Sequence, residues 1–306
     1  MCAGGPSDAV PTDAFVTVGG PSGTRFVTVR RFAQVDSTNR YLIDEARTGA
    51  PEGLVAVADF QRAGRGRLGR RWQAPAGSNL LVSVLLRPAL EPRALHLCTV
   101  AAALATIGAC TRVARLDVRI KWPNDLLVGE RKLAGILAET VPSDGGAAPV
   151  GGGATGAHGG AAPADAVSAV THRAVIVGVG VNVRWPPEGG TEGMAGSEES
   201  DVVRSATSIW RETGVAVEPA SLLEAVLTEL EPRVADLSTP EGRRRLTKDY
   251  RRRCVTLGQP VRVATAQGDI EGTAVDVTVD GHLVVRTDTG FRTVVAGDVV
   301  HVRSAH

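Results

Sequence analysis

The stretch QRAGRGRLGRRW, residues 61–72, holds five arginines and three glycines. Short apolar runs at residues 54–58 and 79–86 flank it, and both are typical of β-strands. Its glycines permit positive φ angles and a close approach of the backbone to a ligand. Arginine stays protonated and binds carboxylate or phosphate through paired hydrogen bonds. The sequence therefore predicts a loop between two strands that closes over an anion, although a solvated basic loop has the same composition.

Two known motifs share this glycine spacing, and neither fits. Gly64, Gly66 and Gly69 match the dinucleotide-binding fingerprint GxGxxG, but a helix should follow its third glycine, and here a strand follows. The glycine-rich loop of protein kinases does lie between two strands, but the chain contains neither HRD nor DFG.

Length and composition narrow the class of protein. The 306 residues, 43% of them hydrophobic, predict about two domains with a sizeable core. A net charge of +1 gives no overall basic field for nucleic acid. Cys2, Cys98, Cys110 and Cys254 show no metal-ligand spacing, which favours free thiols in a reducing cytosol. The start is unlike a signal peptide and the apolar segment 94–110 contains polar residues, so we expect a core helix, a cytoplasmic protein and no membrane contact.

The chain divides into three parts. Residues 1–24, rich in Gly, Pro, Ser and Ala, predict a disordered leader, and residues 25–254 alternate between strand and helix periods. We expect strands at residues 26–32, 118–128, 133–139 and 174–183, with a hairpin turn at Gly129, and helices at 40–46, 92–113, 219–237 and 239–253. The Gly/Ala-rich segment 142–172 predicts a flexible insertion, and we assign no function to it or to the acidic stretch 188–201.

Residues 255–306 form the third part, in which the hydrophobic period changes to short alternating strands. These strands are expected near residues 261–265, 270–279, 282–287, 291–295 and 299–303, and glycine-containing turns separate them. The pattern predicts a small β-barrel domain.

Three features leave a functional and a purely structural interpretation open. Residues 36–39 can cap a helix, or offer hydroxyl, amide and free N–H groups to a polar ligand. Lys121 lies in an otherwise apolar strand, so it either snorkels from the strand edge or points into a polar pocket. Gly178 and Gly180 interrupt a buried strand, which indicates close approach of a ligand or tight packing of another backbone.

Taken together, the chain resembles the biotin protein ligases (biotin–[acetyl-CoA-carboxylase] ligases) over about residues 26–303. Four separated motifs stand in the family's order: DSTN at 36–39, residues 61–72, KWPND at 121–125 with LAGIL at 133–137, and GVGVN at 178–182. The resemblance implies an α+β fold, with a mixed-sheet catalytic domain at 25–254 related to class II aminoacyl-tRNA synthetases and an SH3-like barrel at 255–306. Only about 25 residues precede the catalytic part, so we expect the form without an N-terminal DNA-binding domain and no DNA partner.

The resemblance also implies a reaction in two steps. The biotin carboxylate attacks the α-phosphate of ATP with Mg²⁺ present, and biotinyl-5′-AMP and pyrophosphate form. A lysine amine on the biotin carboxyl carrier domain of an acyl-CoA carboxylase then attacks this mixed anhydride. Both steps concentrate negative charge, which fixed cations stabilise.

By resemblance, the site residues fall into three groups. The residues expected to be catalytic are Lys121 and Arg67. The residues expected to bind biotin are Ser37, Thr38, Asn39, Gln61, Arg65, Gly66, Arg67, Lys121 and Gly135. Binding of ATP or the adenylate falls to Arg67, Arg70, Trp72, Lys121, Asn124, Gly178, Gly180 and Asn182, and Asn182 is also the expected Mg²⁺ contact. For Asn124, a role in forming a turn is the alternative.

Two further expectations concern the cations. No other lysine of the motifs is expected to replace Lys121. The arginine loop carries five like charges and no apolar face, so its order is expected to come from the bound anion.

Two other functions remain to be separated from biotin ligation. A lipoate ligase or octanoyltransferase belongs to the same superfamily, but the arginine loop and the KWPND stretch argue against it. A non-enzymatic biotin-binding protein would need to have lost a catalytic group, whereas Lys121, Arg67 and Asn182 are all present.

Overall fold

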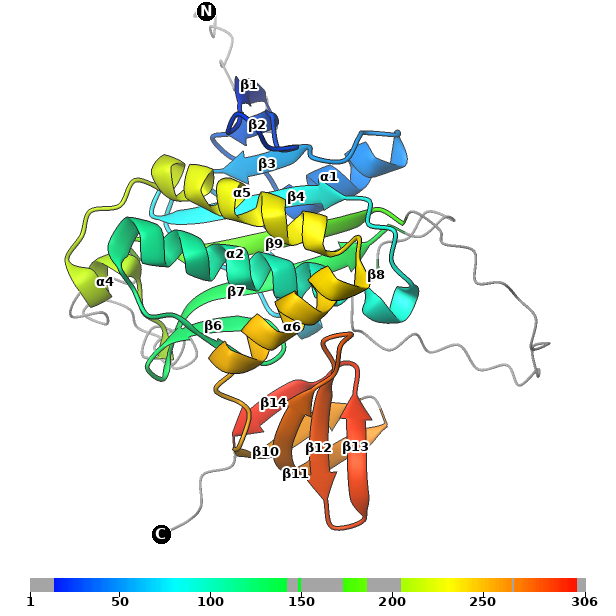
Figure 1. Ribbon diagram of the computed structural model, residues 1–306. Helices are drawn as coiled ribbons and strands as arrows, with labels where there is room; N and C mark the ends of the chain where they lie inside the picture. The colour runs from blue at the N-terminus through cyan, green and yellow to red at the C-terminus, as the bar shows by residue number, and fades with distance from the viewer. Residues whose placement is uncertain (1–13, 142–147, 150–172, 186–204, 266, 302–306) are drawn as a thin grey trace, which may run out of the picture.

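The computed structural model of the chain contains two sheets, one above the other in Figure 1. It describes residues 14–141, 148–149, 173–185, 205–265 and 267–301. The larger sheet belongs to the N-terminal part of the chain and the smaller one to its last fifty residues, in agreement with the predicted change of pattern near residue 255.

The larger sheet has nine strands in the order β1-β2-β3-β4-β9-β7-β6-β5, and β8 pairs with β7. Strands β2 and β3 run parallel, whereas the other neighbours are antiparallel, so the predicted mixed sheet is confirmed. The strands are β1 (Phe15–Gly19), β2 (Thr28–Phe32), β3 (Val55–Ala58), β4 (Asn79–Leu86), β5 (Arg119–Lys121), β6 (Asp125–Val128), β7 (Arg131–Thr140), β8 (Ala148–Pro149) and β9 (Val175–Asn182).

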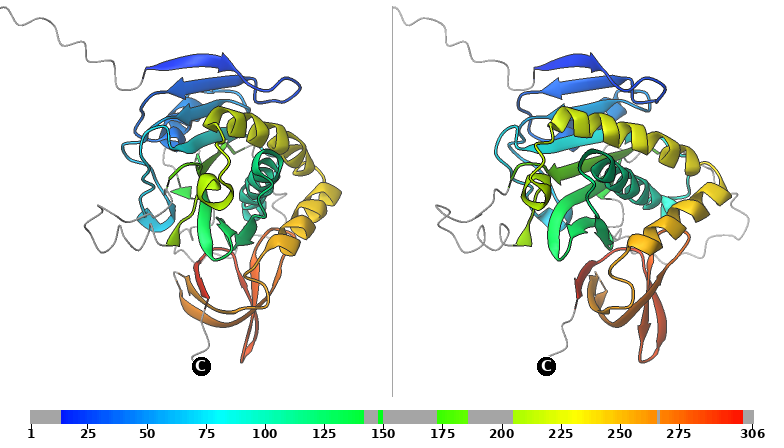
Figure 2. Two further views of the ribbon diagram at one scale, coloured as in Figure 1. Left: turned by 90° about the vertical axis from the view of Figure 1, so that its left-hand side faces the viewer. Right: turned by 60° about the vertical axis from the view of Figure 1, so that its left-hand side comes forward.

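Helices cover both faces of this sheet, which explains why β3 and β4 are buried along their whole length. One face carries α2 (Leu97–Ala114), α5 (Pro219–Asp236) and α6 (Pro240–Arg253), and the opposite face carries α1 (Thr38–Arg47) (Figures 1 and 2). Short helical turns η1 (Arg67–Gly69), η2 (Pro92–Ala94) and α4 (Ile209–Thr213) lie in the connections. The α1 face is therefore the less covered one.

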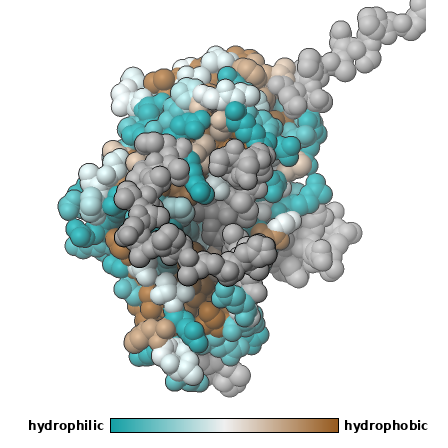
Figure 3. All heavy atoms as spheres, turned by 90° about the vertical axis from the view of Figure 1, so that its right-hand side faces the viewer, coloured by the Kyte–Doolittle hydropathy of each residue, from teal (hydrophilic) through white to brown (hydrophobic). Residues whose placement is uncertain are grey.

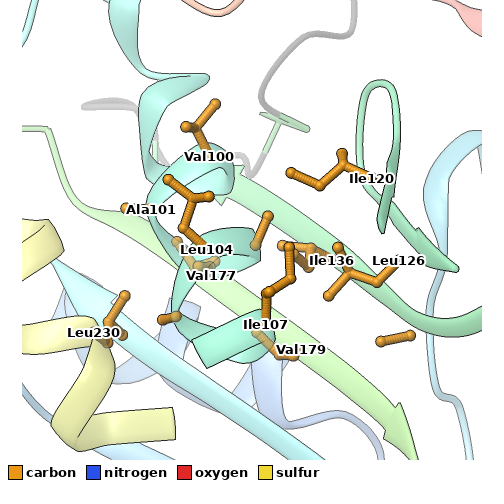
Figure 4. Packing of buried hydrophobic residues seen from close by; sticks show 14 of the residues in the cluster. Val100, Ala101, Leu104, Ile107, Ile120, Leu126, Ile136, Val177, Val179 and Leu230 are labelled. Carbon is orange, nitrogen blue, oxygen red and sulfur yellow. The ribbon is translucent and has the colours of Figure 1, made fainter. Parts of the chain in front are cut away.

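The main core lies between α2 and the sheet. Val100, Leu104 and Ile107 of α2 pack toward Ile136 of β7 and Val179 of β9 (Figure 4). The segment Pro92–Ala114 is long and apolar enough to cross a membrane, but 89% of it is buried inside the protein. It is apolar all round because the sheet and the neighbouring helices surround it. The expectation of a core helix here is confirmed.

The C-terminal sheet is antiparallel, with the strand order β13-β12-β11-β10-β14. Its strands are β10 (Pro260–Thr265), β11 (Gly268–Val277), β12 (Leu283–Thr287), β13 (Gly290–Val294) and β14 (Asp298–His301). Its inner side chains are buried, whereas Phe291 is 72% exposed, and hydrophobic and hydrophilic surface alternate on this part of the molecule (Figure 3). The alternating pattern of the sequence follows from this inside-outside arrangement.

Buried hydrogen bonds fasten the two sheets together. Trp122 donates its indole Nε1–H to the carbonyl of Gly281 at 3.0 Å, and its backbone N–H donates to Thr256 Oγ1 at 3.0 Å. Next to this junction, the hydroxyl of Tyr250 on α6 donates to the carbonyl of Pro123 at 3.1 Å, which holds the turn between β5 and β6 against the helix. Because these groups are buried and paired, separating the sheets would leave several polar atoms without partners.

Residues 14–24 differ from the predicted disordered leader, because β1 pairs with β2 along five residues. The Phe15 ring lies 5.5 Å from Phe32 and 6.1 Å from Tyr41, and the Arg30 guanidinium lies 4.8 Å from its centroid. The sequence did not predict this strand because it is short and lies between Gly/Pro-rich stretches. Residues 1–13, the rest of the leader, lie outside the described residues, as do the acidic stretch and nearly all of the predicted insertion.

The expected strand at 118–128 was also wrong in one respect. A turn with a cis Trp122-Pro123 bond divides it into β5 and β6, which pair with each other. Proline cannot donate a hydrogen bond to a strand ladder, which accounts for the break. The hairpin with its turn at Gly129 is confirmed, and Gly129 has a φ of 58°.

The three cysteines within the described residues, Cys98, Cys110 and Cys254, are free, as predicted, and all three are buried. Burial raises the pKa of the Cys98 and Cys110 thiols to about 12, because the thiolate would lose its hydration. These side chains therefore behave as small apolar core residues.

We predict that Trp122→Phe lowers the free energy of unfolding by about 1–3 kcal/mol, because the carbonyl of Gly281 loses its buried donor. Urea unfolding of the whole chain measures this difference. Trp210→Phe is the matched control, since Trp210 is 39% exposed, and its effect should be much smaller. Equal effects of the two substitutions would contradict this role of the Trp122 indole.

Candidate functional site

A cavity of about 1180 Å³ opens on the α1 face of the larger sheet. The start of α1, the arginine loop, strands β4, β5, β6, β7 and β9, and the C-terminal sheet all contribute to its wall. Every residue that the resemblance assigned to biotin, ATP or the adenylate lines it: Ser37, Thr38, Asn39, Gln61, Arg65, Gly66, Arg67, Arg70, Trp72, Lys121, Asn124, Gly135, Gly178, Gly180 and Asn182. The four motifs thus meet at one place, and what each residue binds stays a prediction.

One end of the cavity is polar and carries no net charge. Ser37 caps α1, and its hydroxyl accepts from the backbone N–H of Arg40 at 3.5 Å. The next backbone N–H, that of Thr38, donates to Gln61 Oε1 at 2.8 Å. Ser37, Thr38 and Asn39 are all buried although they are polar. The helix start therefore both caps α1 and presents polar groups to the cavity, so both interpretations of residues 36–39 describe it.

Two buried polar residues that the sequence analysis missed support this end. Ser83 of β4 donates to Asn39 Oδ1 at 2.6 Å and lies 2.7 Å from the Thr38 hydroxyl. Glu139 of β7 accepts from Asn39 Nδ2 at 2.8 Å. Their only sequence signal is that each is a polar residue in a strand that is otherwise buried.

Glycines of two adjacent strands form a flat floor. Gly135 of β7 lies directly opposite Gly180 of β9, and the Trp72 ring rests on both. A Cβ atom at Gly180 would come within 2.6 Å of the ring, and one at Gly135 within 3.0 Å. A Cβ atom at Gly178 would stand 2.2 Å from Asn39 Oδ1. Tight packing therefore explains the two glycines of β9, although the packed groups are side chains and not another backbone.

The arginine loop closes the cavity and has anionic partners inside the protein. Arg65 forms an ion pair with Glu139 at 3.1 Å, and Arg70 forms one with Asp298 of the C-terminal sheet. Arg67 donates to the carbonyl of Gly297 at 3.1 Å. Carboxylates far away in the sequence thus neutralise part of the charge of the loop, and its ordering by a bound anion stays a prediction.

Arg67 is the most buried arginine head of this loop and lies at the junction of the two sheets. Besides the carbonyl of Gly297, it contacts Asn124 Oδ1 at 3.3 Å. Burial lowers the pKa of the Arg67 guanidinium, and the carboxylates of Asp298 and Asp125 oppose this effect. Asn124 also donates to the carbonyl of Ile136 at 2.8 Å, so it both holds its turn against β7 and positions Arg67.

Two of the three lysines in the chain line this cavity, although the chain uses arginine for nearly all its positive charge. Lys121 at the end of β5 is half-buried, and no hydrogen bond or ion pair to its side chain is found among the described residues. Lys132 of β7 forms an ion pair with Asp125 at 2.7 Å, and its ammonium lies 5.7 Å from the Trp72 centroid. A second lysine therefore lies at the cavity, outside the four motifs, and the expectation that no lysine of the motifs replaces Lys121 stays a prediction.

The signal for Lys132 was present in the sequence, since it stands immediately before the LAGIL motif. It lies between the strands expected at residues 118–128 and 133–139, and the sequence analysis gives it no role. A register irregularity between β6 and β7 lies next to it and brings its side chain to the wall of the cavity.

Asn182, the expected Mg²⁺ contact, is held by hydrogen bonds inside the protein. Its Oδ1 accepts from Asn79 Nδ2 at 2.9 Å, and its Nδ2 donates to the carbonyl of Thr207 at 2.9 Å and that of Lys132 at 3.3 Å. Only 3% of its surface is exposed, and its amide joins β4, β9 and the residues before α4. One lone pair of Oδ1 remains, and a role as a metal contact stays a prediction. Within the described part of the chain, no group of three or more His, Cys, Asp or Glu side chains could hold a metal ion.

The cavity thus joins a neutral polar end to a cationic end. The first offers hydroxyl and amide groups that suit a small polar ring. The second offers Arg67, Arg70, Lys121 and Lys132, which suit carboxylate and phosphate groups. Between them the Trp72 ring provides an apolar surface on the glycine floor. A ligand with a neutral polar head, an apolar middle and an anionic end fits this arrangement.

Comparisons with known families agree with the motifs. The model of the Biotin/lipoate A/B protein ligase family matches residues 31–150, and that of the Biotin protein ligase C terminal domain matches residues 256–302. These two ranges correspond to much of the larger sheet and to nearly the whole C-terminal sheet.

Curated relatives match along almost the whole chain. The biotin–[acetyl-CoA-carboxylase] ligase of Mycobacterium tuberculosis is 35% identical over 94% of this chain and 92% of its own length. That of Paracoccus denitrificans is 31% identical over 87% of this chain and 98% of its own. Among solved structures, biotin protein ligase from Aquifex aeolicus in complex with biotin and ATP shares the fold, with a TM-score of 0.67 and 23% identity over 90% of this chain and 99% of that one. The chain belongs to the biotin protein ligase family.

Proposed function

We propose that this chain activates biotin with ATP and transfers it to a carrier protein. In the first step a biotin carboxylate oxygen bonds to the α-phosphorus of ATP, the bond to the β-phosphate breaks, and pyrophosphate leaves. In the second step a lysine amine bonds to the activated carbonyl carbon, AMP leaves, and the amine loses a proton. The observation that carries this proposal is the single cavity that joins a neutral polar end to a cationic end.

The polar end suits the cyclic urea of biotin. Its two N–H groups and one carbonyl need acceptors and a donor, and the Thr38 hydroxyl and the Gln61 side-chain amide supply both kinds of group. The start of α1 adds the partial positive charge of a helix N-terminus, which favours the urea oxygen.

The cationic end suits the groups that react. The biotin carboxylate and the α-phosphate are both negative, so bringing them together requires fixed positive charge. Lys132 is already held by Asp125, and Arg67 by Asn124 and the carbonyl of Gly297, so neither needs a large rearrangement. The indole of Trp72 extends between the two ends and suits the alkyl chain of biotin or the adenine ring.

Mg²⁺ enters this proposal as part of the nucleotide substrate. ATP-dependent enzymes commonly bind Mg²⁺ through the phosphates and water with few protein ligands. This agrees with a cavity wall in which the carboxylates of Asp125 and Asp298 are paired with cations.

The relatives named as biotin–[acetyl-CoA-carboxylase] ligases support a biotin carboxyl carrier domain of an acyl-CoA carboxylase as the acceptor. We further infer a relation of the larger sheet to the class II aminoacyl-tRNA synthetases and of the C-terminal sheet to SH3-like barrels. The mostly antiparallel mixed sheet and the five short antiparallel strands support these two assignments.

We expect the purified chain to release pyrophosphate from ATP only when biotin is present, and then to label one lysine of a carrier domain. A coupled pyrophosphate assay and mass spectrometry of the carrier measure the two steps. Lipoate in place of biotin is the control, because the other branch of the superfamily uses it. Pyrophosphate release with lipoate but not with biotin would contradict the proposal.

The three lysines allow a direct test of the cationic end. We expect Lys132→Ala to lower the rate of adenylate formation by about 10²–10³-fold, because its ammonium is held at the cavity beside Trp72. Lys121→Ala should have a smaller effect, since Lys132 remains. Lys248→Ala on the exposed face of α6 is the matched control and should leave the rate unchanged. A large loss confined to Lys121→Ala would restore the original assignment.

The glycine floor gives a further test. Gly180→Ala should lower kcat/KM for ATP by about tenfold to a hundredfold, because the new methyl group displaces the Trp72 ring. Gly19→Ala is the control, since a Cβ atom there meets nothing within 4 Å. Steady-state kinetics at saturating biotin decide the matter, and normal kinetics of Gly180→Ala would mean that the ring position does not matter for catalysis.

A further inference from the structure

We propose that Glu139 is a positioning residue that sets the biotin-binding end of the cavity by holding Asn39 and Arg65 at the same time. This inference rests on the proposed function, since it concerns how the cavity is prepared for the biotin ring. No motif discussed above includes Glu139, and its position at the end of a strand gave no reason to expect a role.

Glu139 is an unusual carboxylate for its surroundings. It lies on β7, on the same face as Gly135 and Leu137, and only 1% of its side chain is exposed. A carboxylate removed from water is costly unless charged or hydrogen-bonding partners surround it. Its two partners are Asn39 Nδ2, at 2.8 Å from Oε2, and Arg65 Nη1, at 3.1 Å from Oε1. The two oxygens thus serve two different elements, the start of α1 and the arginine loop.

The carboxylate also fixes which way the neighbouring groups point. A carboxylate and a carbonyl can only accept, so Asn39 turns its amino group to Glu139 and to the carbonyl of Leu137 at 3.2 Å. Its Oδ1 then faces Ser83, which must donate to it at 2.6 Å. The Thr38 hydroxyl lies 2.7 Å from Ser83 Oγ and 3.1 Å from Gln61 Oε1, and its single proton can serve only one of them. Because Ser83 gives its own proton to Asn39, the shorter contact needs the proton of Thr38, while Gln61 Oε1 still accepts from the Thr38 backbone N–H at 2.8 Å.

This directed chain has a consequence for the ligand. The Thr38 hydroxyl donates its proton to Ser83. It also lines the cavity, so its lone pairs can accept a hydrogen bond from a donor group of the ligand. A cyclic urea brings two N–H donors, so the chain prepares an acceptor where this head group needs one. Asn39 can occupy this position because residue 178 is a glycine; a Cβ atom there would stand 2.2 Å from Asn39 Oδ1.

The second partner connects this end to the loop. Arg65 is about half exposed, so the ion pair reaches from the surface of the loop to a carboxylate in the interior. When Arg65 leaves, Glu139 stays buried with one charged contact fewer, which disfavours an open loop. The same carboxylate therefore orients the head-group site and favours a closed loop above it.

Glu139→Gln tests this double role with almost no change of shape. A glutamine must turn its amino group toward Asn39 or toward Arg65, and both are donors, so one of the two contacts is lost in either orientation. We expect the Kd and the KM for biotin to rise about tenfold to a hundredfold. The KM for ATP and kcat at saturating biotin should change little. Glu139→Asp keeps both acceptors and the charge, so it should recover part of the affinity.

Two controls make the result specific. Glu231→Gln removes a partly buried carboxylate from an ion pair with Arg25 outside the cavity wall, and it should leave the Kd for biotin unchanged. Limited trypsin digestion without ligand should cut the arginine loop faster in Glu139→Gln than in the wild-type protein. In a double-mutant cycle, Glu139→Gln should add little to the loss of biotin affinity already caused by Arg65→Ala, because the two substitutions break the same contact.

Calorimetry of biotin binding decides the inference independently of turnover. An unchanged Kd for biotin in Glu139→Gln would overturn the inference. A fall in kcat and a rise in the KM for ATP as large as the loss of biotin affinity would also overturn it, because such changes indicate general damage to the protein. A wild-type protein that binds biotin but releases no pyrophosphate would instead contradict the proposed function.

Discussion

The pairing of β7 with β9 is the constraint on which the rest of the site depends. Their antiparallel register sets Gly135 opposite Gly180 and Leu137 opposite Gly178, so three glycines leave part of one face of the two strands without side chains. Because side chains alternate along a strand, a slip by one residue would place large apolar groups there. Trp72 and the start of α1 can approach the backbone closely only because this face is bare. The cavity is thus a product of the sheet and not of the loops alone.

Paired charges complete what the sheet begins. The arginine loop is held from two sides, by Glu139 of the larger sheet and by Asp298 of the C-terminal sheet. Buried hydrogen bonds of Trp122 keep the two sheets together, so the position of Asp298 relative to the loop is itself fixed by the core. Trp122 belongs to the KWPND motif but lies outside the cavity wall, so it contributes to the site through packing. This arrangement explains why the chain needs both sheets for one cavity.

Much of the fold could be predicted because the hydrophobic pattern of the sequence is strong. The alternation of apolar and polar residues predicted the C-terminal strands, and the apolar content of one segment predicted the core helix α2. The motifs also indicated which residues would meet. Contacts between distant segments could not be predicted. Glu139 and Ser83 look like ordinary strand residues until pairing brings them to Asn39. Lys132 looks like a turn residue until the irregularity in β7 aims it inward. Asn182 has the right chemistry for a metal contact, but the hydrogen bonds that hold its amide also come from distant segments.

The central claim is that the Thr38–Asn39 end of the cavity holds the biotin ring while the lysine and arginine end holds the reacting carboxylate. A crystal structure of the chain with biotin and a non-hydrolysable ATP analogue tests this most directly. The account predicts the urea ring within hydrogen-bonding distance of Thr38, above Gly178 and Leu137, and the carboxylate next to Lys132 and Arg67. A biotin bound in the opposite direction, or with its ring away from the start of α1, would contradict it.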